Sequence, residues 1–367
     1  MTVNSQRLLL AAAGAAGAAE PGLYVDDVFS CVLWDGHVVG GEQDIDAGID
    51  LTEGGLVWAK ARDASDHHYL VDSELGKTGS YYDNLATSLT GSVVTNEVYG
   101  VETFNNNGFT VDGSHPRLND GSKTYVSWVF KETPGFFDIV KYTGNSTAGH
   151  NVAHDLGSVP GCILIKKLGS TSDWYVYHRE LGNTKALRLN DDGNQVTGVW
   201  NSTTPTSTHF TLANHTEVNE SGQEYIAYIF AHDDQSFGTN SDEAIIKCGT
   251  YEGNATTGNY VDVGFEPQWL MIKNADDSST NWVIFDSMRG FHAKGSQPRR
   301  LSANSSDTEA NNLEVTREPR GFSLTGGGTY TNSNNHTFVY VAIRRPHKPP
   351  EAATDVFKTV AGTYSAG

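Results

Sequence analysis

The sequence predicts an all-β protein made of three tandem antiparallel β-sandwich repeats of jelly-roll-like type, with a short N-terminal arm. Three observations predict this fold class. One stretch of sequence occurs three times, short β-branched and aromatic runs alternate with turn residues, and no long amphipathic helical window separates them. The two clearest copies are LGSVPGCILIKKLGSTSDWYVYHRELG at 156–182 and GFEPQWLMIKNADDSSTNWVIFDSMRG at 264–290, with a weaker copy at 54–76.

Other landmarks keep the same register through the chain. Each copy is preceded by an aromatic-x-Gly turn, whose glycines lie 108 and 109 residues apart: Gly36, Gly144 and Gly253. The lysines that close the first extended run lie 106 and 107 residues apart: Lys60, Lys166 and Lys273. We therefore predict an arm, three repeats and a tail, with the boundaries 1–26, 27–132, 133–241, 242–345 and 346–367.

Six strands are expected in each repeat, because each run is short, apolar and bounded by Gly, Asn, Asp or Ser. In the first repeat they are 28–33, 56–60, 69–72, 91–95, 109–111 and 125–130. In the second they are 138–142, 162–166, 174–178, 186–189, 210–212 and 225–230. In the third they are 245–251, 269–273, 282–286, 314–316, 322–324 and 338–343. Within 125–130, alternation groups Val126, Trp128 and Phe130 on one face, which we assign to the core.

Composition argues against two classes of partner. The net charge is −19, and no basic block interrupts the acidic chain, so we expect no nucleic-acid partner. An anionic membrane surface is disfavoured for the same reason, and no apolar run is long enough to span a bilayer. We therefore expect no membrane insertion.

The three cysteines do not form a pattern that suggests a metal site or a disulfide framework. Cys31, Cys162 and Cys248 are far apart, and their odd number leaves at least one thiol unpaired. Cys162 and Cys248 lie inside apolar runs, so we expect buried, reduced thiols.

Candidate metal ligands have simpler explanations. His150 and His154 have a zinc-like spacing, but no Cys or carboxylate sits at a fixed interval beside them, so turn or surface histidines are expected. The adjacent His67 and His68 would point to opposite faces if they lay in a strand, so we do not expect them to form a ligand pair. Three Asp-rich turns have oxygens that suit calcium. Asx turns explain them without an ion. They are Asn190–Gly193, Asn274–Asp277 and Asn119–Gly121.

Catalysis is not indicated. The expected strands 69–72, 174–178 and 282–286 end in Asp72, His178 and Asp286. Because these side chains differ in type, the repeats do not share one catalytic group at this position. No nucleophile, nucleotide-loop or thiol motif is convincing, so we expect no enzyme, no catalytic residue, no cofactor and no metal. Four tryptophans stand at repeat landmarks, where core positions are expected rather than an aromatic platform for sugar: Trp58, Trp174, Trp269 and Trp282.

The N-terminal arm is apolar and Ala-rich from Leu8 to Ala19. Arg7 before this stretch imitates a secretory signal, although much of the stretch is Ala and Gly. Because small residues let backbones approach closely, we expect the arm to dock on a neighbouring protein or on other copies of this chain, most plausibly in a trimer. The tail repeats the start of the first repeat, since Asp355-Val-Phe-Lys resembles Asp27-Val-Phe-Ser.

Several strings resemble a known repeat domain. They are SQRLLLAAAGAAG, YVDDVFS, YVSWVFKETPGFFDIVKYTGN, VAHDLGSVPGCILIKK, NWVIFD-x-x-RG and FVYVAIR. Together they are similar to a domain of unknown function in virion proteins of marine tailed bacteriophages, which are labelled tail fibre or virion structural protein. The resemblance covers residues 5–345. The first repeat departs from it, with Gly54 where the others have Pro160 and Pro267.

The resemblance implies a class of protein and no catalytic residues. It implies an exposed virion structural protein on the tail or capsid surface, acting as a tail fibre or in host attachment. Capsid decoration, a carbohydrate-binding lectin-like module and a glycan-degrading tail enzyme are the alternatives. The expected partners are other virion proteins through the arm, further copies of the chain, and a host surface glycan or receptor.

Overall fold

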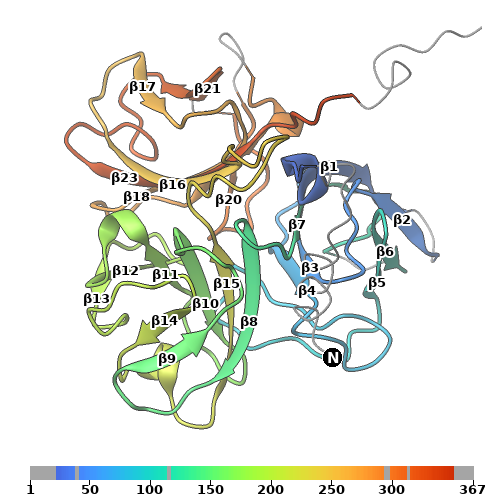
Figure 1. Ribbon diagram of the computed structural model, residues 1–367. Coiled ribbons are helices and arrows are strands. Elements are labelled where there is room, and N and C mark those ends of the chain that lie inside the picture. Colours follow the sequence, from blue (N-terminus) through green and yellow to red (C-terminus); the bar gives the residue numbers. More distant parts are fainter. Residues whose placement is uncertain (1–21, 38–40, 114–116, 293–297, 312–314, 351–367) are drawn as a thin grey trace, which may run out of the picture.

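The protein is almost entirely β in the computed structural model, which describes residues 22–37, 41–113, 117–292, 298–311 and 315–350. Its strands form six sheets, in which every pair of neighbouring strands is antiparallel. This confirms the predicted all-β class. Figure 1 shows three lobes around a common centre: β1–β7 in blue and teal, β8–β15 in green and yellow, and β16–β23 in orange and red.

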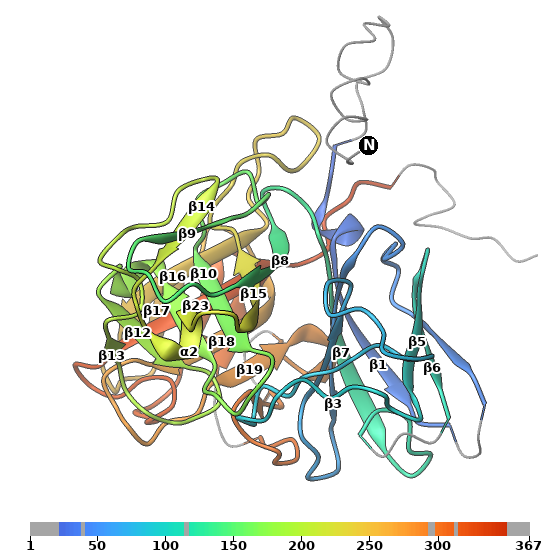
Figure 2. The same ribbon diagram turned by 90° about the horizontal axis from the view of Figure 1, so that it is seen from below.

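The first lobe pairs a larger sheet with a smaller one. The larger sheet has the order β1-β7-β3-β4, with β1 (Phe29–Asp35), β7 (Thr124–Lys131), β3 (Gly55–Ala61) and β4 (Tyr69–Asp72). The smaller sheet has the order β2-β6-β5, with β2 (Gln43–Asp46), β6 (Gly108–Asp112) and β5 (Gly100–Asn105). A 3-10 turn, η1 (Val25–Asp27), precedes them. In Figure 2, β5 and β6 lie on the outer side of the larger sheet, away from the other lobes.

The second lobe repeats this plan with a longer sheet. Its order is β13-β12-β11-β10-β15-β8, with β8 (Phe137–Thr143), β10 (Cys162–Lys167), β11 (Tyr175–His178), β12 (Lys185–Arg188), β13 (Val196–Thr197) and β15 (Glu224–Phe230). β9 (His150–Ala153) and β14 (His209–Leu212) form the small sheet. The short helical turns are η2 (Arg179–Leu181) and α2 (Thr216–Asn219).

The third lobe has the sheet order β16-β23-β18-β19-β20. Its strands are β16 (Ile246–Glu252), β18 (Pro267–Asn274), β19 (Val283–Asp286), β20 (Leu301–Ser302) and β23 (Thr337–Arg344). The small sheet has the order β17-β22-β21, with β17 (Asn259–Asp262), β22 (Gly321–Leu324) and β21 (Val315–Glu318). A 3-10 turn, η3 (Ser287–Arg289), follows β19.

The strand order is the same around the last strand of every lobe. In each larger sheet the first strand lies beside the last, and the last lies beside the third. The register also matches, because Lys60, Lys166 and Lys273 face Val126, Ile226 and Val339 on the last strands. Corresponding residues can therefore be compared from lobe to lobe. The division into three domains and its boundaries stay predictions.

The last strand of the first lobe is buried on both faces, which corrects the one-sided core expected for 125–130. Val126, Trp128 and Phe130 belong to a large central cluster. Tyr125 and Val129 belong to the core between the two sheets of the first lobe. Both faces are covered because the outer face packs on the small sheet and the inner face packs on the other lobes.

Most predicted strands form, and the exceptions have a physical reason. Residues 91–95 form no strand, and only Val94 makes an isolated bridge, to Asn84. Strands β2, β9 and β17 were not predicted, because each buries only one residue, at Ile45, Val152 and Val261. Strands β5, β13 and β20 were not predicted either. Glu314, in the predicted strand 314–316, lies outside the described residues, whereas Val315 and Thr316 lie in β21.

A buried asparagine explains the aromatic-x-Gly turns. The turn glycines would place a Cβ within 2.0, 2.3 and 2.0 Å of the carbonyl oxygens of Asp120, Glu220 and Ser333. No side chain therefore fits at these turns. The residue after each glycine donates its backbone N–H to an asparagine Oδ1, at 2.8, 2.9 and 3.0 Å. These asparagines, fully buried, are Asn119, Asn219 and Asn332.

Candidate functional site

The residues that end the fourth strand of each lobe reach into a neighbouring lobe. Asp72 Oδ2 accepts a hydrogen bond from the Tyr228 hydroxyl at 2.6 Å. Asp286 Oδ2 accepts one from Trp128 Nε1 at 2.9 Å, and His178 Nε2 donates to a backbone carbonyl of β23 at 3.1 Å. The three contacts run from the first lobe to the second, the second to the third and the third to the first. They fasten the lobes to one another.

A second set of three hydrogen bonds between lobes is made by ring nitrogens. Trp174 Nε1 donates to the Ala86 carbonyl at 3.1 Å, and Trp282 Nε1 donates to the Arg188 carbonyl at 2.8 Å. The corresponding position in the first lobe is His68, whose Nε2 is 2.9 Å from the Ser302 carbonyl. Each ring therefore reaches the backbone of a different lobe.

All four landmark tryptophans are buried, as predicted for core positions, with exposures of 0 to 1 %. An aromatic sugar platform made by these side chains is therefore excluded. They are Trp58, Trp174, Trp269 and Trp282.

The landmark lysines are buried and hydrogen-bonded to backbone carbonyls. Lys166 Nζ donates to the Thr90 carbonyl of the first lobe at 3.0 Å, and Lys273 Nζ donates to the Asp192 carbonyl of the second at 3.1 Å. Lys60 stays within its own lobe. Burial lowers the pKa of all three ammonium groups to about 8. These lysines close turns rather than face a cleft.

Apolar packing joins the same lobes. The central cluster includes buried side chains from every lobe, and its rings meet directly. The ring centroids of Phe130 and Phe230 are 5.7 Å apart, and those of Trp128 and Trp269 are 6.3 Å apart. The buried Arg289 guanidinium pairs with Asp286 at 2.6 Å and lies 5.4 Å from the Trp128 ring. A buried ion pair needs further hydrogen bonds, and Arg289 Nη2 donates one to the Ile284 carbonyl at 3.1 Å.

The predicted non-ligand histidines are placed as single structural groups. His150 Nδ1 is 2.8 Å from Asn219 Oδ1, whereas His154 Nε2 is 3.1 Å from the Thr206 carbonyl. His67 Nδ1 is 3.0 Å from the Ser88 hydroxyl. His68 is fully buried, whereas His67 is not. Among the residues that the structure describes, no group of three or more His, Cys, Asp or Glu is placed to hold a metal ion.

The Asp-rich turns are Asx turns. The Gly193 N–H donates to Asp191 Oδ1 at 2.8 Å, and the Ser122 N–H donates to Asp120 Oδ1 at 2.9 Å. Asn274 Oδ1 accepts from the N–H of Asp276 at 3.1 Å. This confirms the predicted turn geometry, and independence from calcium stays a prediction. The three cysteines are free and buried, as expected for Cys162 and Cys248.

An acidic pocket lies between the first and second lobes, with a volume of about 310 Å³. We call it the acidic seam pocket. Its charged and ring-bearing lining residues are Glu74, Glu132, Asp138, Lys141, His154 and Asp155. They come from the turn after β4, the end of β7, the strand β8 and the turn after β9. It is the strongest candidate site, because its charge is not balanced by its own side chains.

Two carboxyl groups of this pocket titrate abnormally. Glu132 Oε1 accepts a hydrogen bond from the Ser73 hydroxyl at 2.6 Å, and Asp138 Oδ2 accepts one from the Asp155 N–H at 2.8 Å. Burial, reinforced by neighbouring carboxylates, raises the pKa of Glu132 to about 7. Burial also raises the pKa of Asp138. Lys141, the lysine of the pocket, is 3.4 Å from Glu224.

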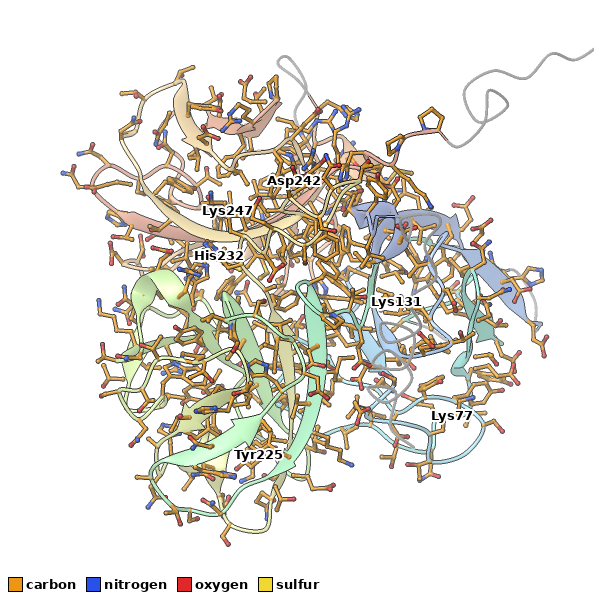
Figure 3. All side chains as sticks on the ribbon, viewed as in Figure 1. Lys77, Lys131, Tyr225, His232, Asp242 and Lys247 are labelled. Atoms are coloured by element: carbon orange, nitrogen blue, oxygen red, sulfur yellow. The ribbon has the colours of Figure 1, made fainter. Side chains whose placement is uncertain are left out.

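The pocket between the second and third lobes is different. It has a volume of about 380 Å³ and contains both signs of charge. Lys247 Nζ is 3.7 Å from Asp233, and Arg344 Nη1 is 2.5 Å from Glu243. Figure 3 shows Lys247 and Asp242 at the junction of these two lobes. The pocket between the third and first lobes also has mixed charge, with Arg62 paired to Glu309 at 2.7 Å.

Comparison with known families adds one assignment. A family model described as a domain of unknown function, DUF7483, matches residues 25–346. The chain belongs to this family. No curated protein and no solved structure matches the chain. No helix in the described part of the DUF7483 chain is long and apolar enough to cross a membrane.

Sequence reasoning did not find the acidic seam pocket. Its carboxylates come from separate elements, and acidic residues are common throughout the chain. A comparison of corresponding positions could have indicated it, because Asp138 corresponds to Ser30 in the first lobe and to Lys247 in the third. This strand position carries a hydroxyl in the first lobe, a carboxylate in the second and an ammonium group in the third. The charge at this position therefore differs from lobe to lobe.

Proposed function

We propose that this protein is a structural component on the exterior of a tailed-phage particle, as a tail fibre or in host attachment. The observation that supports it is the mutual fastening of the lobes. The polar residues that end the fourth strand of each lobe, Asp72, His178 and Asp286, form hydrogen bonds to another lobe. A particle exterior requires a protein that resists local unfolding, and buried inter-lobe bonds supply that resistance.

The sequence resemblance supports the same proposal independently. The strings at 125–145 and 152–167, YVSWVFKETPGFFDIVKYTGN and VAHDLGSVPGCILIKK, are similar to virion proteins of marine tailed phages. They lie at β7, β8 and β10, where the first two lobes meet. The resemblance therefore includes the residues that build the shared centre.

Capsid decoration is the second candidate. It needs the same rigidity and differs only in the place of attachment. A lectin-like use would need a sugar platform other than the landmark tryptophans, because these are buried. We therefore rank decoration above a lectin.

The test is the position of the protein in an electron-microscopy map of the particle that encodes it. Density for the described lobes on the tail or its fibres is the expected result, and density on the capsid shell would favour decoration. If the protein is absent from purified particles by mass spectrometry, the proposal is wrong.

Attachment through residues 1–20 is a separate part of the proposal. That segment lies outside the described residues, and its apolar sequence motivates the assignment. A chain that lacks residues 1–20 is expected to fold and to remain in solution, but not to join particles or to form oligomers. Normal assembly of the truncated chain would contradict this.

A further inference from the structure

His154, one of the residues that line the acidic seam pocket, has a buried ring nitrogen without a hydrogen-bond partner. His154 is 6 % exposed and lines the pocket. Its Nε2 faces the Thr206 carbonyl, which only accepts, so the neutral ring carries its proton on Nε2 and has a lone pair on Nδ1. Among the described residues, Nδ1 has no hydrogen-bond partner. A buried nitrogen of this kind is costly unless something donates to it.

The fold does not require a histidine at this position. The strand registers show that His154 corresponds to Ala47 in the first lobe and to Val263 in the third. Both are buried apolar residues. The second lobe therefore places a polar ring where its neighbours have a hydrocarbon side chain, and it does so only at the acidic pocket.

The third lobe shows what complements such a pocket. At the position of Asp138, it has Lys247, whose ammonium group approaches Asp233 at 3.7 Å across the seam. In the acidic seam pocket that internal cation is replaced by a further carboxylate. Glu74, Glu132 and Asp155 remain, and Lys141 is directed to Glu224. Both pockets are therefore lined by carboxylates, at different positions, but only the pocket of the third lobe has an ammonium group at this strand position.

We propose that the acidic seam pocket binds an organic cation with N–H donors, a primary ammonium or a guanidinium group, supplied by another molecule. The cation would lie among Glu132, Asp138 and His154, with an N–H directed to His154 Nδ1. A volume of about 310 Å³ is at the lower limit for ligand pockets and suits one small charged group. A bare metal ion is disfavoured, because the described residues contain no three-ligand group. This inference does not rest on the proposed function.

The buried carboxyl groups give binding in this pocket a dependence on pH. Glu132 and Asp138 have raised pKa values because they are buried beside Glu74, Asp72 and Asp155. A bound cation would favour their ionised forms and release protons. Protonation of Glu132, Asp138 or His154 would compete with binding, with Lys141 as the other cation of the pocket. Binding is therefore expected to weaken from pH 7.5 to pH 5.

The test is a calorimetric titration of the full chain at low ionic strength with defined probes. These are Nα-acetyl-lysine N-methylamide, methylguanidinium and glucosamine, with tetramethylammonium and calcium chloride as comparisons. Saturable binding of the first group, and weak or no binding of the comparisons, is expected, because only the first group donates N–H bonds. Tighter binding of the lysine amide would identify a protein side chain as the source, and tighter binding of glucosamine would identify an amino sugar.

Variants then locate the site. His154→Val, which copies the third lobe, and Glu132→Gln are each expected to weaken binding by about 10- to 100-fold, the range for one charge-assisted hydrogen bond. Glu53→Gln removes an exposed carboxylate elsewhere and is expected to bind as the unmodified chain does. Asp138→Lys is expected to abolish binding by supplying the ammonium internally. If Asp138→Lys does not fold, the other variants still decide.

Three results would overturn the proposal. The first is absence of saturable binding for every N–H donor probe at pH 7.5. The second is unchanged affinity in both His154→Val and Glu132→Gln. The third is calcium binding that these two variants abolish, since that would make the pocket a metal site.

Discussion

Some buried side chains in this protein both fill the core of one lobe and donate a hydrogen bond to the backbone of another lobe. Trp282 is an example, since it is 1 % exposed and its Nε1 donates to the Arg188 carbonyl of the second lobe. Trp174 does the same toward Ala86 of the first lobe. Loss of such a side chain removes packing and leaves a carbonyl unpaired at the same time.

We predict that Trp282→Ala lowers the free energy of unfolding by about 3–5 kcal/mol, as for other large aromatic truncations in cores. Trp282→Phe keeps one aromatic ring in the core but removes the indole N–H and part of the ring volume, so a smaller loss of about 1–3 kcal/mol is expected. Urea denaturation followed by tryptophan fluorescence and circular dichroism measures both. Equal losses in the two variants would show that the indole N–H and the ring volume that Phe lacks account for the whole effect, and that the remaining ring contributes little.

The pH dependence of stability is set partly by buried carboxyl groups at the lobe junctions. Burial raises the pKa of Asp72 to about 6 and that of Glu132 to about 7, above the usual values near 3.8 and 4.5. A raised folded-state pKa contributes stability below the unfolded-state pKa, and that stability is lost as pH rises through the folded-state pKa. These two groups therefore oppose folding increasingly between about pH 4 and pH 7.

Glu132→Gln is accordingly predicted to be more stable relative to the unmodified chain at pH 7.5 than at pH 4.5. Urea midpoints at the two pH values measure the difference. Glu53→Gln, at an exposed position, serves as the control and is expected to show no such change. A Glu132→Gln effect that is the same at both pH values would show that the carboxyl group is not titrating in this range.

At the scale of elements, the turns depend on close approach of backbones. The Gly144 Cβ position lies 2.3 Å from the Glu220 carbonyl oxygen, and the turn is held by Asn219. Gly91, in contrast, has no neighbouring atom within 4 Å. The two glycines thus test steric demand separately from backbone entropy.

Gly144→Ala is predicted to lower the melting temperature of the whole chain, because the strand β8 and the turn before β15 must move apart. Gly91→Ala is expected to be neutral or slightly stabilising, since Ala restricts the unfolded chain. Differential scanning calorimetry measures both. Equal melting temperatures for the two variants would show that the turn adjusts to a side chain.

The elements also show which features can be predicted from sequence. Strands such as β3, β10 and β18 are long apolar runs, and they form where expected. The strands β9 and β17 read HNVA and NYVD, and one buried residue in four gives no usable periodicity. Their pairing is decided by the partner strands β14 and β22, which lie 59 and 62 residues further along the chain, counted from strand start to strand start.

The candidate site could not be predicted from the sequence either, because it also depends on contacts between segments that are far apart in the chain. Glu132 and Asp138 are close in sequence, but His154 joins the pocket only because the turn after β9 meets β8, where the Asp155 N–H donates to Asp138 Oδ2. Contacts between lobes add a second difficulty. The Trp174 bond to the Ala86 carbonyl joins an indole to a backbone atom, so the acceptor side chain has no characteristic type.

At the scale of the whole molecule, the central cluster decides how the chain unfolds. The sequence suggests units joined by short linkers, which could unfold one at a time. The central cluster instead includes Phe29, Phe230 and Trp269 from three lobes. A lobe that unfolds therefore exposes apolar side chains of the other two lobes to water. We therefore expect the three lobes to unfold together.

The free cysteines allow this cooperativity to be measured, because each lobe contains one buried thiol: Cys31, Cys162 and Cys248. We predict that pulsed thiol labelling in increasing urea shows one midpoint for all three. Trp282→Ala, in the third lobe, is predicted to shift the three midpoints by the same amount. If only the Cys248 midpoint shifts, the lobes are independent domains and the shared cluster does not couple them. Coupling is expected because Trp282 reaches Arg188 in the second lobe, while Asp286 of the same strand reaches Trp128 in the first.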